Sequence, residues 1–264
     1  MLVHVEGVGL WGPGLFGWPH SRAILRGETA FECEARPAPA SELLAAAERR
    51  RAPATVRLAM RVAQEACAEA QVSAATLASV FASSQGDTEI TDYMCRELAV
   101  PGTAISPTKF HNSVHNAASG YWTIATGCTL AASAISGYRE SFACGLLEAA
   151  CCSVAGSNAT LLAAYDIVAP MPMATVCPIS ANFGVGLVLS PIRTSRSLAQ
   201  VRIALTAGER AEPALTRQLE SLRDTNPIAR SLPLLVTLAR SVPATIDLKL
   251  TDRQMITLEI TPWT

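Results

Sequence analysis

The sequence is poor in charge and has no long apolar run. Only 16% of its 264 residues are charged, and 21 Lys and Arg nearly cancel 22 Asp and Glu, which leaves a formal net charge of -1. Without positive excess a protein does not hold a nucleic acid through bulk charge. No apolar run reaches the ~18 residues of a membrane-spanning helix, and residues 1–9 do not have the pattern of a secretory signal. These absences predict a soluble, cytoplasmic protein with no membrane span and no nucleic-acid partner.

Histidine is scarce, and the eight cysteines are scattered. There is no C-x-x-C and no Cys/His cluster with the spacing of zinc ligands, so we expect no disulfide framework, no metal and no other cofactor. All four histidines lie before residue 116. Two of them, His111 and His115, would share one helix face, but no third ligand has a matching spacing. Together with Asn116 they are expected to cap a helix, to form a polar interface or to line a tunnel.

Apolar residues, in contrast, are abundant. Half of the residues are hydrophobic and the mean hydropathy is +0.27. This surplus exceeds what a compact monomer normally needs for its core. The chain can therefore form one long domain or two short ones, and a partner subunit is expected to cover some of its apolar surface.

Apolar strands alternate with helices along the chain. The predicted strands cover residues 3–8, 79–84, 129–136, 159–164, 185–190 and 201–206, with a hairpin of 245–250 and 255–261. The predicted helices cover residues 41–50, 55–71, 91–99, 113–126, 140–151, 213–223 and 227–240. Residues 13–39 and 101–112 are predicted to be loops. This order and the nearly continuous apolar strands indicate an α/β fold with a sheet covered on both faces.

One junction is more specific than the general α/β pattern. The uncharged strand 129–136 is followed by Gly137, Tyr138 and Arg139, and then by a helix from Glu140 that is rich in small residues. This is the layout of a nucleophile elbow, in which a side chain stands at a helix N-terminus and backbone amides can stabilise an anion. Such turns also occur without catalysis, so the layout alone leaves both interpretations open.

Several motifs together resemble a known family. Val-Phe-Ala-Ser-Ser-Gln-Gly-Asp at 80–87, His-Asn-Ala-Ala-Ser-Gly-Tyr-Trp at 115–122 and the helix at 140–150 resemble, in order and spacing, the N-terminal half of the β-ketoacyl synthases of the thiolase superfamily. Gly-Leu-Trp-Gly-Pro-Gly at 9–14, Ile-Thr-Asp-Tyr-Met at 90–94 and the segment 226–235 are similar to the compact ketosynthase-like chain length factors of aryl polyene and related pigment pathways.

The resemblance implies a thiolase-like layered α/β fold with a reduced C-terminal half. Residues 1–264 are expected to form a single domain. Within it, residues 1–193 correspond to the ketosynthase N-terminal half, and residues 194–264 to a truncated C-terminal half of two helices and a β-hairpin.

The resemblance also allows a test for catalytic residues. An active ketosynthase is expected to carry a cysteine at the elbow and two histidines late in the chain. Alignment without gaps places Arg139 at the cysteine position, and no histidine follows His115. A guanidinium is always protonated and cannot attack a thioester. The residues Gly137, Tyr138 and Arg139 are therefore interpreted as a degenerate elbow, and no catalytic residue is assigned.

Another alignment makes Cys128 the nucleophile of a free-standing acyltransferase. This alignment requires a deletion, about as long as one turn, in the strand at 129–136. The preferred interpretation of Cys128 is therefore a small buried residue at the start of that strand. A homodimeric scaffold without an acyl tunnel is a third possibility.

The favoured hypothesis is a non-catalytic chain length factor, not an enzyme on its own. In that hypothesis, the chain pairs with an active β-ketoacyl synthase, meets an acyl carrier protein through the complex and helps to shape the acyl tunnel. Alone, it could form a homodimer. The family is expected to dimerise through antiparallel pairing of the strand before the elbow, which consists here of Thr129, Leu130, Ala131, Ala132, Ser133, Ala134, Ile135 and Ser136.

Overall fold

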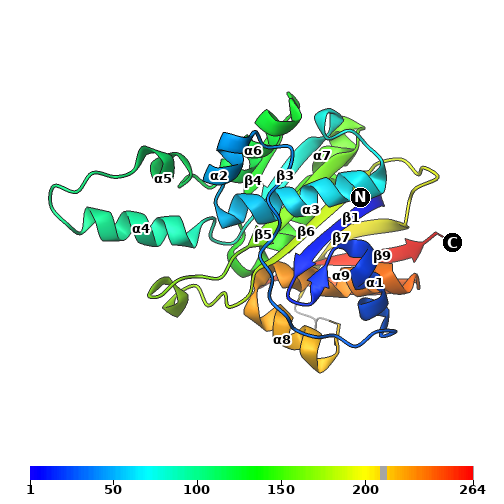
Figure 1. Cartoon of the computed structure of the whole chain (residues 1–264). Helices are drawn as coiled ribbons and strands as arrows, with labels where there is room; N and C mark the ends of the chain where they lie inside the picture. The colour runs from blue at the N-terminus through cyan, green and yellow to red at the C-terminus, as the bar shows by residue number, and fades with distance from the viewer. Residues whose placement is uncertain (209–212, 264) are drawn as a thin grey trace.

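A computed structural model describes residues 1–208 and 213–263, and it contains one large mixed sheet with helices packed against it (Figure 1). The strands follow the order β4-β3-β5-β6-β1-β7-β9-β8, and β2 pairs with β1. Strand β3 is parallel to β4 and to β5, and all other neighbours are antiparallel. Among the described residues, no helix is long and apolar enough to cross a membrane.

The elements are bounded as follows. The strands are β1 (Leu2–Gly12), β2 (Leu15–Phe16), β3 (Ala78–Ala82), β4 (Ala132–Ile135), β5 (Thr160–Asp166), β6 (Phe183–Ser190), β7 (Ala199–Ala207), β8 (Ala244–Thr251) and β9 (Gln254–Pro262). The α-helices are α1 (Trp18–Arg26), α2 (Ala46–Arg51), α3 (Ala54–Ala70), α4 (Thr88–Leu98), α5 (Pro107–His111), α6 (Ala117–Thr126), α7 (Ser141–Gly156), α8 (Arg217–Thr225) and α9 (Leu232–Arg240). Short 3-10 turns are η1 (Ala74–Thr76), η2 (Tyr138–Glu140), η3 (Met173–Thr175) and η4 (Pro227–Ser231).

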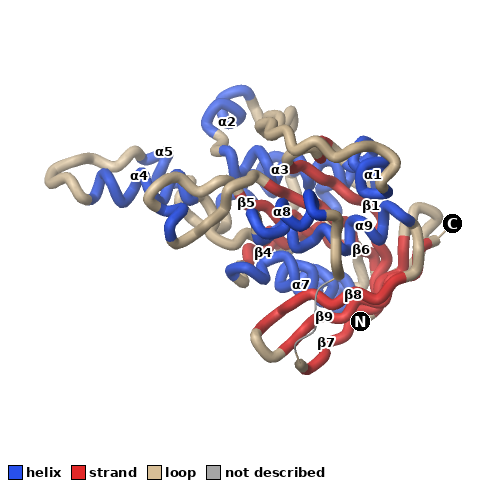
Figure 2. Tube along the Cα trace, turned by 90° about the horizontal axis from the view of Figure 1, so that it is seen from below, coloured by secondary structure: helices blue, strands red, loops and turns tan. Residues whose placement is uncertain are grey.

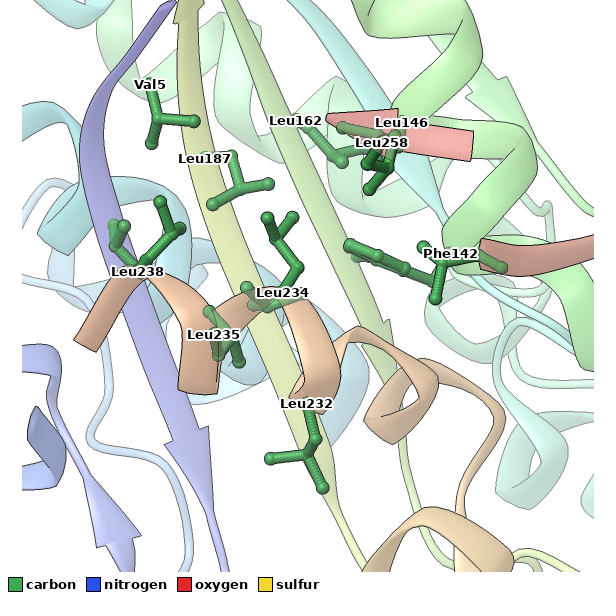
Figure 3. Packing of buried hydrophobic residues seen from close by; sticks show 14 of the residues in the cluster. Val5, Phe142, Leu146, Leu162, Leu187, Leu232, Leu234, Leu235, Leu238 and Leu258 are labelled. Carbon is green, nitrogen blue, oxygen red and sulfur yellow. The ribbon is translucent and has the colours of Figure 1, made fainter. Parts of the chain in front are cut away.

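Two apolar cores lie on opposite faces of the sheet. Helices α3 and α6 cover one face, and α1, α7 and α9 cover the other, as Figure 2 shows for α3 and α7. Figure 3 shows leucines of α9, among them Leu234 and Leu238, lying over Val5 of β1 and Leu187 of β6. The prediction of a sheet covered on both faces is therefore confirmed for β3, β5, β6 and β1.

Strand β7 differs from these strands, because one of its faces is exposed. Along β7 buried residues alternate with exposed ones, so that Val201 and Ile203 are buried whereas Arg202 and Ala204 are exposed. Successive side chains of a strand point to opposite faces of the sheet, so this alternation shows that one face of β7 is exposed to solvent. Strand β7 thus contributes only one of its faces to the core.

The predicted strands and most predicted helices are present, with shifted ends. Residues 13–39, predicted to be a loop, contain α1, and residues 101–112 contain α5. The strand predicted at 129–136 covers only 132–135, and the helix predicted to begin at residue 113 begins at Ala117. The helix predicted at 227–240 is divided into η4 and α9. Of the helix predicted at 213–223, α8 covers 217–223 and continues to Thr225.

Helix α3 lies directly on the backbone of β1 and β6. Gly9 and Gly186 are paired across these strands. A Cβ atom on Gly9 would lie 2.0 Å from the carbonyl oxygen of Val62 in α3, and one on Gly186 would lie 2.2 Å from the same oxygen. Glycine at both positions is therefore required for this close approach.

A buried carboxylate of α3 extends this contact to α1. The Oε2 atom of Glu65 accepts a hydrogen bond from the amide of Leu10 (3.0 Å), and Oε1 accepts one from the amide of Trp18 (2.5 Å). Trp18 is the first residue of α1, where free amides favour a negative charge. Burial raises the pKa of Glu65, although these two hydrogen bonds lower it. Glu65 thus fixes both the end of β1 and the start of the helix missed by the sequence pattern.

The glycine contact gives the first prediction. Replacing Gly9 by alanine should lower the free energy of unfolding by about 3 kcal/mol or more, because the new methyl group meets backbone that cannot rotate away. Chemical denaturation of Gly9→Ala should show this loss. The matched control is Gly120→Ala in α6, where a Cβ meets nothing within 4 Å; it should leave stability unchanged or raise it by about 0.5–1 kcal/mol. Equal stability of the two variants would contradict the packing argument.

Candidate functional site at the carboxyl ends of three strands

Strand β4 runs into a sharp turn and then into helix α7. Tyr138 in this turn has a left-handed backbone, with φ of 53°. The buried hydroxyl of Ser141 accepts a hydrogen bond from the amide of Gly137 (3.0 Å) and donates one to the carbonyl of Tyr138 (2.7 Å). A non-glycine residue in this conformation is strained, and the Ser141 hydroxyl holds the strained turn closed. The segment has the strand, turn and helix geometry of an elbow.

Neither side chain at the tip of this turn is a thiol. Tyr138 and Arg139 are both exposed, and Arg139 has no ion pair among the described residues. The thiol that packs against the turn belongs to Cys144, because a Cβ on Gly137 would lie 2.4 Å from its sulfur. Burial, and then the charge of Glu140, raises the pKa of the Cys144 thiol. This thiol therefore remains protonated at neutral pH and is a poor nucleophile.

The turn after β3 is built around a buried carboxylate, that of Asp166 at the end of β5. Its Oδ1 atom accepts hydrogen bonds from the hydroxyl of Ser83 (2.7 Å) and the amide of Ser84 (2.9 Å), whereas Oδ2 has no hydrogen-bond partner. Burial raises the pKa of Asp166 to about 6, although the hydrogen bonds from Ser84 and Ser83 lower it. The carboxylate thus joins the ends of β3 and β5 at an electrostatic cost.

Three further side chains fix the same strand ends. Ser136, which follows β4, donates to the carbonyl of Ser84 (3.0 Å). The Nε2 atom of His115 lies 3.1 Å from the carbonyl of Ser83. Asn226 donates its side-chain amide to the carbonyl at the end of β5 (3.3 Å) and to a carbonyl just before β6 (2.8 Å). The elbow, the turn after β3 and the end of β5 are therefore one hydrogen-bonded network.

The cavity beside the elbow is nearly closed. It is lined by Ser84, Gln85, Tyr138, Arg139, Cys177, Pro178, Ile179, Arg223, Asp224 and Pro227. Its volume is about 20 Å³, which is enough for about one water molecule. In this conformation the chain offers no room for an acyl group at its own elbow.

A larger cavity lies on the other side of the segment between β5 and β6. Its volume is about 570 Å³, and its walls come from the residues just before β6, the segment 31–37 and α8. Most of the lining is apolar. No pattern in the sequence indicated this cavity, because its walls come from segments far apart in the chain.

The two histidines predicted to share a helix face lie in different segments, so that prediction is wrong. His111 is exposed and ends α5, and His115 lies before α6, which begins only at Ala117. The ring of His111 lies 6.5 Å from that of Tyr121, and His115 joins the network at Ser83. Asn116 is exposed at the N-cap position of α6 and makes no capping hydrogen bond with its side chain. Among the described residues no group of His, Cys, Asp and Glu could hold a metal ion.

The alternative nucleophile, Cys128, lies at the other end of β4. Its thiol is buried and donates a hydrogen bond to the carbonyl of Leu77 (3.2 Å), which precedes β3. Because β3 and β4 are parallel, these two residues lie where the strands begin, whereas the elbow lies where they end. The structure therefore does not bring Cys128 together with the elbow or with His115.

The segment predicted to form the interface is the outer edge of the sheet. Within the described chain β4 pairs only with β3, which leaves its other edge free. Ala132 and Ala134 are exposed, as are Leu130 and, on the adjoining helix, Ile124. The strand predicted at 129–136 is too long, since residues 129–131 and 136 lie outside β4, whereas the interface itself stays a prediction.

Two residues of the network, Asp166 and Asn226, were not predicted as site residues. The only local signal for Asp166 is that a lone acidic residue ends an otherwise uncharged strand. Asn226 belongs to a segment that resembles the family, but no pattern assigned it to strand ends 60 residues away. Both residues act through tertiary contacts.

Comparisons with known proteins identify the family. Residues 26–240 match the model of the β-ketoacyl synthase N-terminal domain, so the chain belongs to the β-ketoacyl synthase family. No curated protein matches the sequence. The resemblance to the β-ketoacyl synthases found in the sequence, and the mixed α/β, thiolase-like ketosynthase fold that it implies, are thereby confirmed.

Three solved complexes contain similar folds. The ketosynthase ApeO in complex with its chain length factor ApeC from Xenorhabdus doucetiae matches with a TM-score of 0.74 and 21% identity, covering 98% of this chain and 99% of that one. The ishigamide ketosynthase/chain length factor matches with a TM-score of 0.76 and 13% identity over 100% of both chains. AntDE:AntF, a type II polyketide synthase acyl carrier protein with its ketosynthase, matches with a TM-score of 0.75 and 11% identity over 99% of both chains.

The buried carboxylate gives the second prediction. The pKa of Asp166 is raised from its usual 3.8 to about 6 in the fold, so the folded state binds this proton more tightly than the unfolded state. Its contribution to the free energy of unfolding should be largest below pH 4 and fall as the pH rises to about 6, a loss on the order of 3 kcal/mol. Denaturation between pH 4 and 7.5 should show that Asp166→Asn lacks this fall.

The control for this measurement is Asp252→Asn, whose side chain is 97% exposed. It should retain the wild-type pH profile. A wild-type profile in Asp166→Asn would show that the buried carboxylate does not titrate in this range.

Proposed function

We propose that this chain is a non-catalytic chain length factor that pairs with an active β-ketoacyl synthase in type II polyketide or aryl polyene biosynthesis. One observation carries the proposal: the elbow of a ketosynthase fold is present, but Tyr138 and Arg139 stand at its tip and no thiol does. A permanently protonated guanidinium cannot accept an acyl group. The buried position of Cys128 at the far end of β4 supports the same assignment.

The partners are proposed from the solved relatives. In one of them a ketosynthase is bound to its chain length factor, and in another a ketosynthase is bound to its acyl carrier protein. By analogy, this chain pairs with a ketosynthase and meets the carrier protein through that complex. The proposed site of action is the cytoplasm, and the chain can form a homodimer when it is alone.

The partner surface is proposed to centre on β4. A free edge strand presents unpaired backbone groups that a second strand can pair with, and the segment 129–136 would pair with its counterpart antiparallel across a two-fold or pseudo-two-fold axis. Figures 1 and 2 show α4 and α5 projecting from the body of the molecule. Large apolar side chains are exposed on this arm, on α6 and around β4: Leu98, Val100, Phe110, Val114, Ile124, Leu130 and Tyr138. Their burial supplies the hydrophobic driving force for association.

The closed cavity at the elbow determines what the subunit can contribute to the acyl tunnel. A cavity of about 20 Å³ cannot hold an acyl chain. The acyl chain would therefore grow in the partner's site. This subunit would supply walls at the shared surface, with Arg139 as a polar anchor toward the partner. The proposal treats residues 1–264 as one thiolase-like domain, in which 1–193 correspond to the ketosynthase N-terminal half and 194–264 to a reduced C-terminal half.

The third prediction tests whether the chain accepts an acyl group. Purified alone and incubated with an acyl carrier protein thioester, the protein should show no acyl adduct by intact-protein mass spectrometry, because neither side chain at the elbow tip is a thiol and Cys128 is buried. A stoichiometric adduct that is absent in Cys128→Ala and present in Cys144→Ala would overturn the proposal in favour of a free-standing acyltransferase.

The fourth prediction tests the partner surface. Ala132→Asp and Ala134→Asp should abolish association with the ketosynthase, because an unpaired charge buried at an interface costs on the order of several kcal/mol. Both positions are exposed in the single chain, so the variants should keep the wild-type melting temperature as monomers. Light scattering of the co-purified subunits measures the outcome.

The matched control is Ala204→Asp, at an exposed position of β7 on the other side of the sheet's centre. It should leave the assembly intact. Complexes of wild-type mass for both β4 variants would remove this strand from the interface.

A further inference from the structure

A polar cavity lies on the side of the molecule away from the α4 and α5 arm. It is bordered by α1, the C-terminal end of α9, the loop between β6 and β7 and the residue after β9, near the two chain ends in Figure 1. Its volume is about 270 Å³. We name it the arginine pocket after the side chains that line it together with hydroxyls and one indole: Arg22, Arg193, Arg196, Ser195, Ser241 and Trp263.

The pocket carries an excess of positive charge. Three arginines line it, no acidic residue is among its described lining residues, and none of the three makes an ion pair with a described residue. The buried carboxylate of Glu6 lies behind the pocket loop. Both of its oxygens already accept hydrogen bonds from the pocket loop, from the hydroxyls of Thr194 and Ser197. The described lining of the pocket thus holds three guanidinium groups and no carboxylate.

The arginines are not needed to stabilise the end of α9. A helix C-terminus carries partial negative charge and attracts cations. At α9 this need is met by Arg26, outside the pocket, whose Nε atom donates to the carbonyl of Ala239 (2.6 Å). Within the part of the chain that the structure describes, the three pocket arginines therefore have neither an ion-pair partner nor a hydrogen bond to the end of the helix.

Trp263 holds one of the arginines in position. The guanidinium carbon of Arg193 lies 3.8 Å from the centre of the Trp263 ring, and His4 stacks with the same indole at 6.3 Å. The amide of Trp263 donates to the carbonyl of Leu198 (3.0 Å), which fixes the indole beside the loop. A guanidinium held by a ring loses less freedom on binding a ligand, and its donors stay available at its edge.

We infer that the arginine pocket binds the phosphate group of a small phosphorylated molecule. Guanidinium groups match the geometry of phosphate oxygens and bind them through paired, charge-assisted hydrogen bonds. The hydroxyls of Ser195 and Ser241 add neutral donors. The volume lies just below the roughly 300–1,000 Å³ of sites for larger organic ligands, so it fits a phosphate with a small organic remainder. The pocket is separate from the proposed partner surface, so this inference does not depend on the proposed function.

Isothermal titration of the full chain with inorganic phosphate and with glycerol phosphate tests the inference. Saturable binding is expected for at least one of them, and sodium chloride at equal ionic strength should not reproduce it. Tighter binding of glycerol phosphate would identify an ester as the source of the phosphate, and equal affinity would identify the free ion. Arg196→Gln and Arg22→Gln should each weaken the binding at least about tenfold, by loss of a charge-assisted hydrogen bond.

The control is Arg217→Gln, an exposed arginine outside the pocket, which should keep the wild-type affinity. Melting temperatures without ligand verify that the variants fold. Absence of saturable phosphate binding at millimolar concentration, or equal weakening in Arg217→Gln, would overturn the inference.

Discussion

The contact between α3 and the glycines of β1 and β6 is the constraint on which the rest of the fold depends. Gly9 and Gly186 let the carbonyl of Val62 approach the sheet more closely than any side chain would permit. The helix then brings Glu65 to the end of β1 and to the start of α1. Because α1 in turn packs on α9, the position of one helix on one face of the sheet determines how the opposite face is covered.

The network at the strand ends holds the elbow in place through contacts between segments that lie far apart in the chain. The elbow keeps its strained turn, held by the Ser141 hydroxyl, and the space beside it is filled. A buried carboxylate, two serine hydroxyls, a histidine and an asparagine join the ends of β3, β4 and β5. Such a network costs stability where Asp166 is ionised, and it makes the elbow a fixed surface feature.

Much of the fold could be predicted from the sequence because its central strands are uncharged and bounded by glycine or polar residues. Strands β3, β5 and β6 were found in this way. Helix α1 was missed because its sequence contains Pro19 and follows a glycine-rich turn, and its start depends on a carboxylate 47 residues away. The predicted length of β4 was too great. The composition of residues 129–136 favours a strand, but β4 has a neighbouring strand on one edge only, and its ends are not held by a second one.

The candidate site was harder to predict because its contacts span long separations in the chain. The composition of the elbow indicated the turn, but Asp166 gave only a weak signal, and the contact of His115 with Ser83 crosses 32 residues. The spacing of His111 and His115 in the sequence predicted that they share one helix face, but the chain leaves the helix between them. Residues that act alone at a turn were therefore predictable, whereas residues that act across strands were not.

The two free edges of the sheet differ, and this difference bears on how the protein can assemble. Strand β4 is short, uncharged and flanked by exposed apolar side chains, whereas β8 carries Asp247 and Lys249 and has an irregular register with β9 between Lys249 and Thr251. Charge and irregularity hinder the addition of a further strand at an edge. The edge-to-edge pairing proposed at β4 would close after two subunits, and the β8 edge is a poor template for continued growth. If the chain pairs through β4 as proposed, the difference between its two edges would favour a closed pair over an open filament.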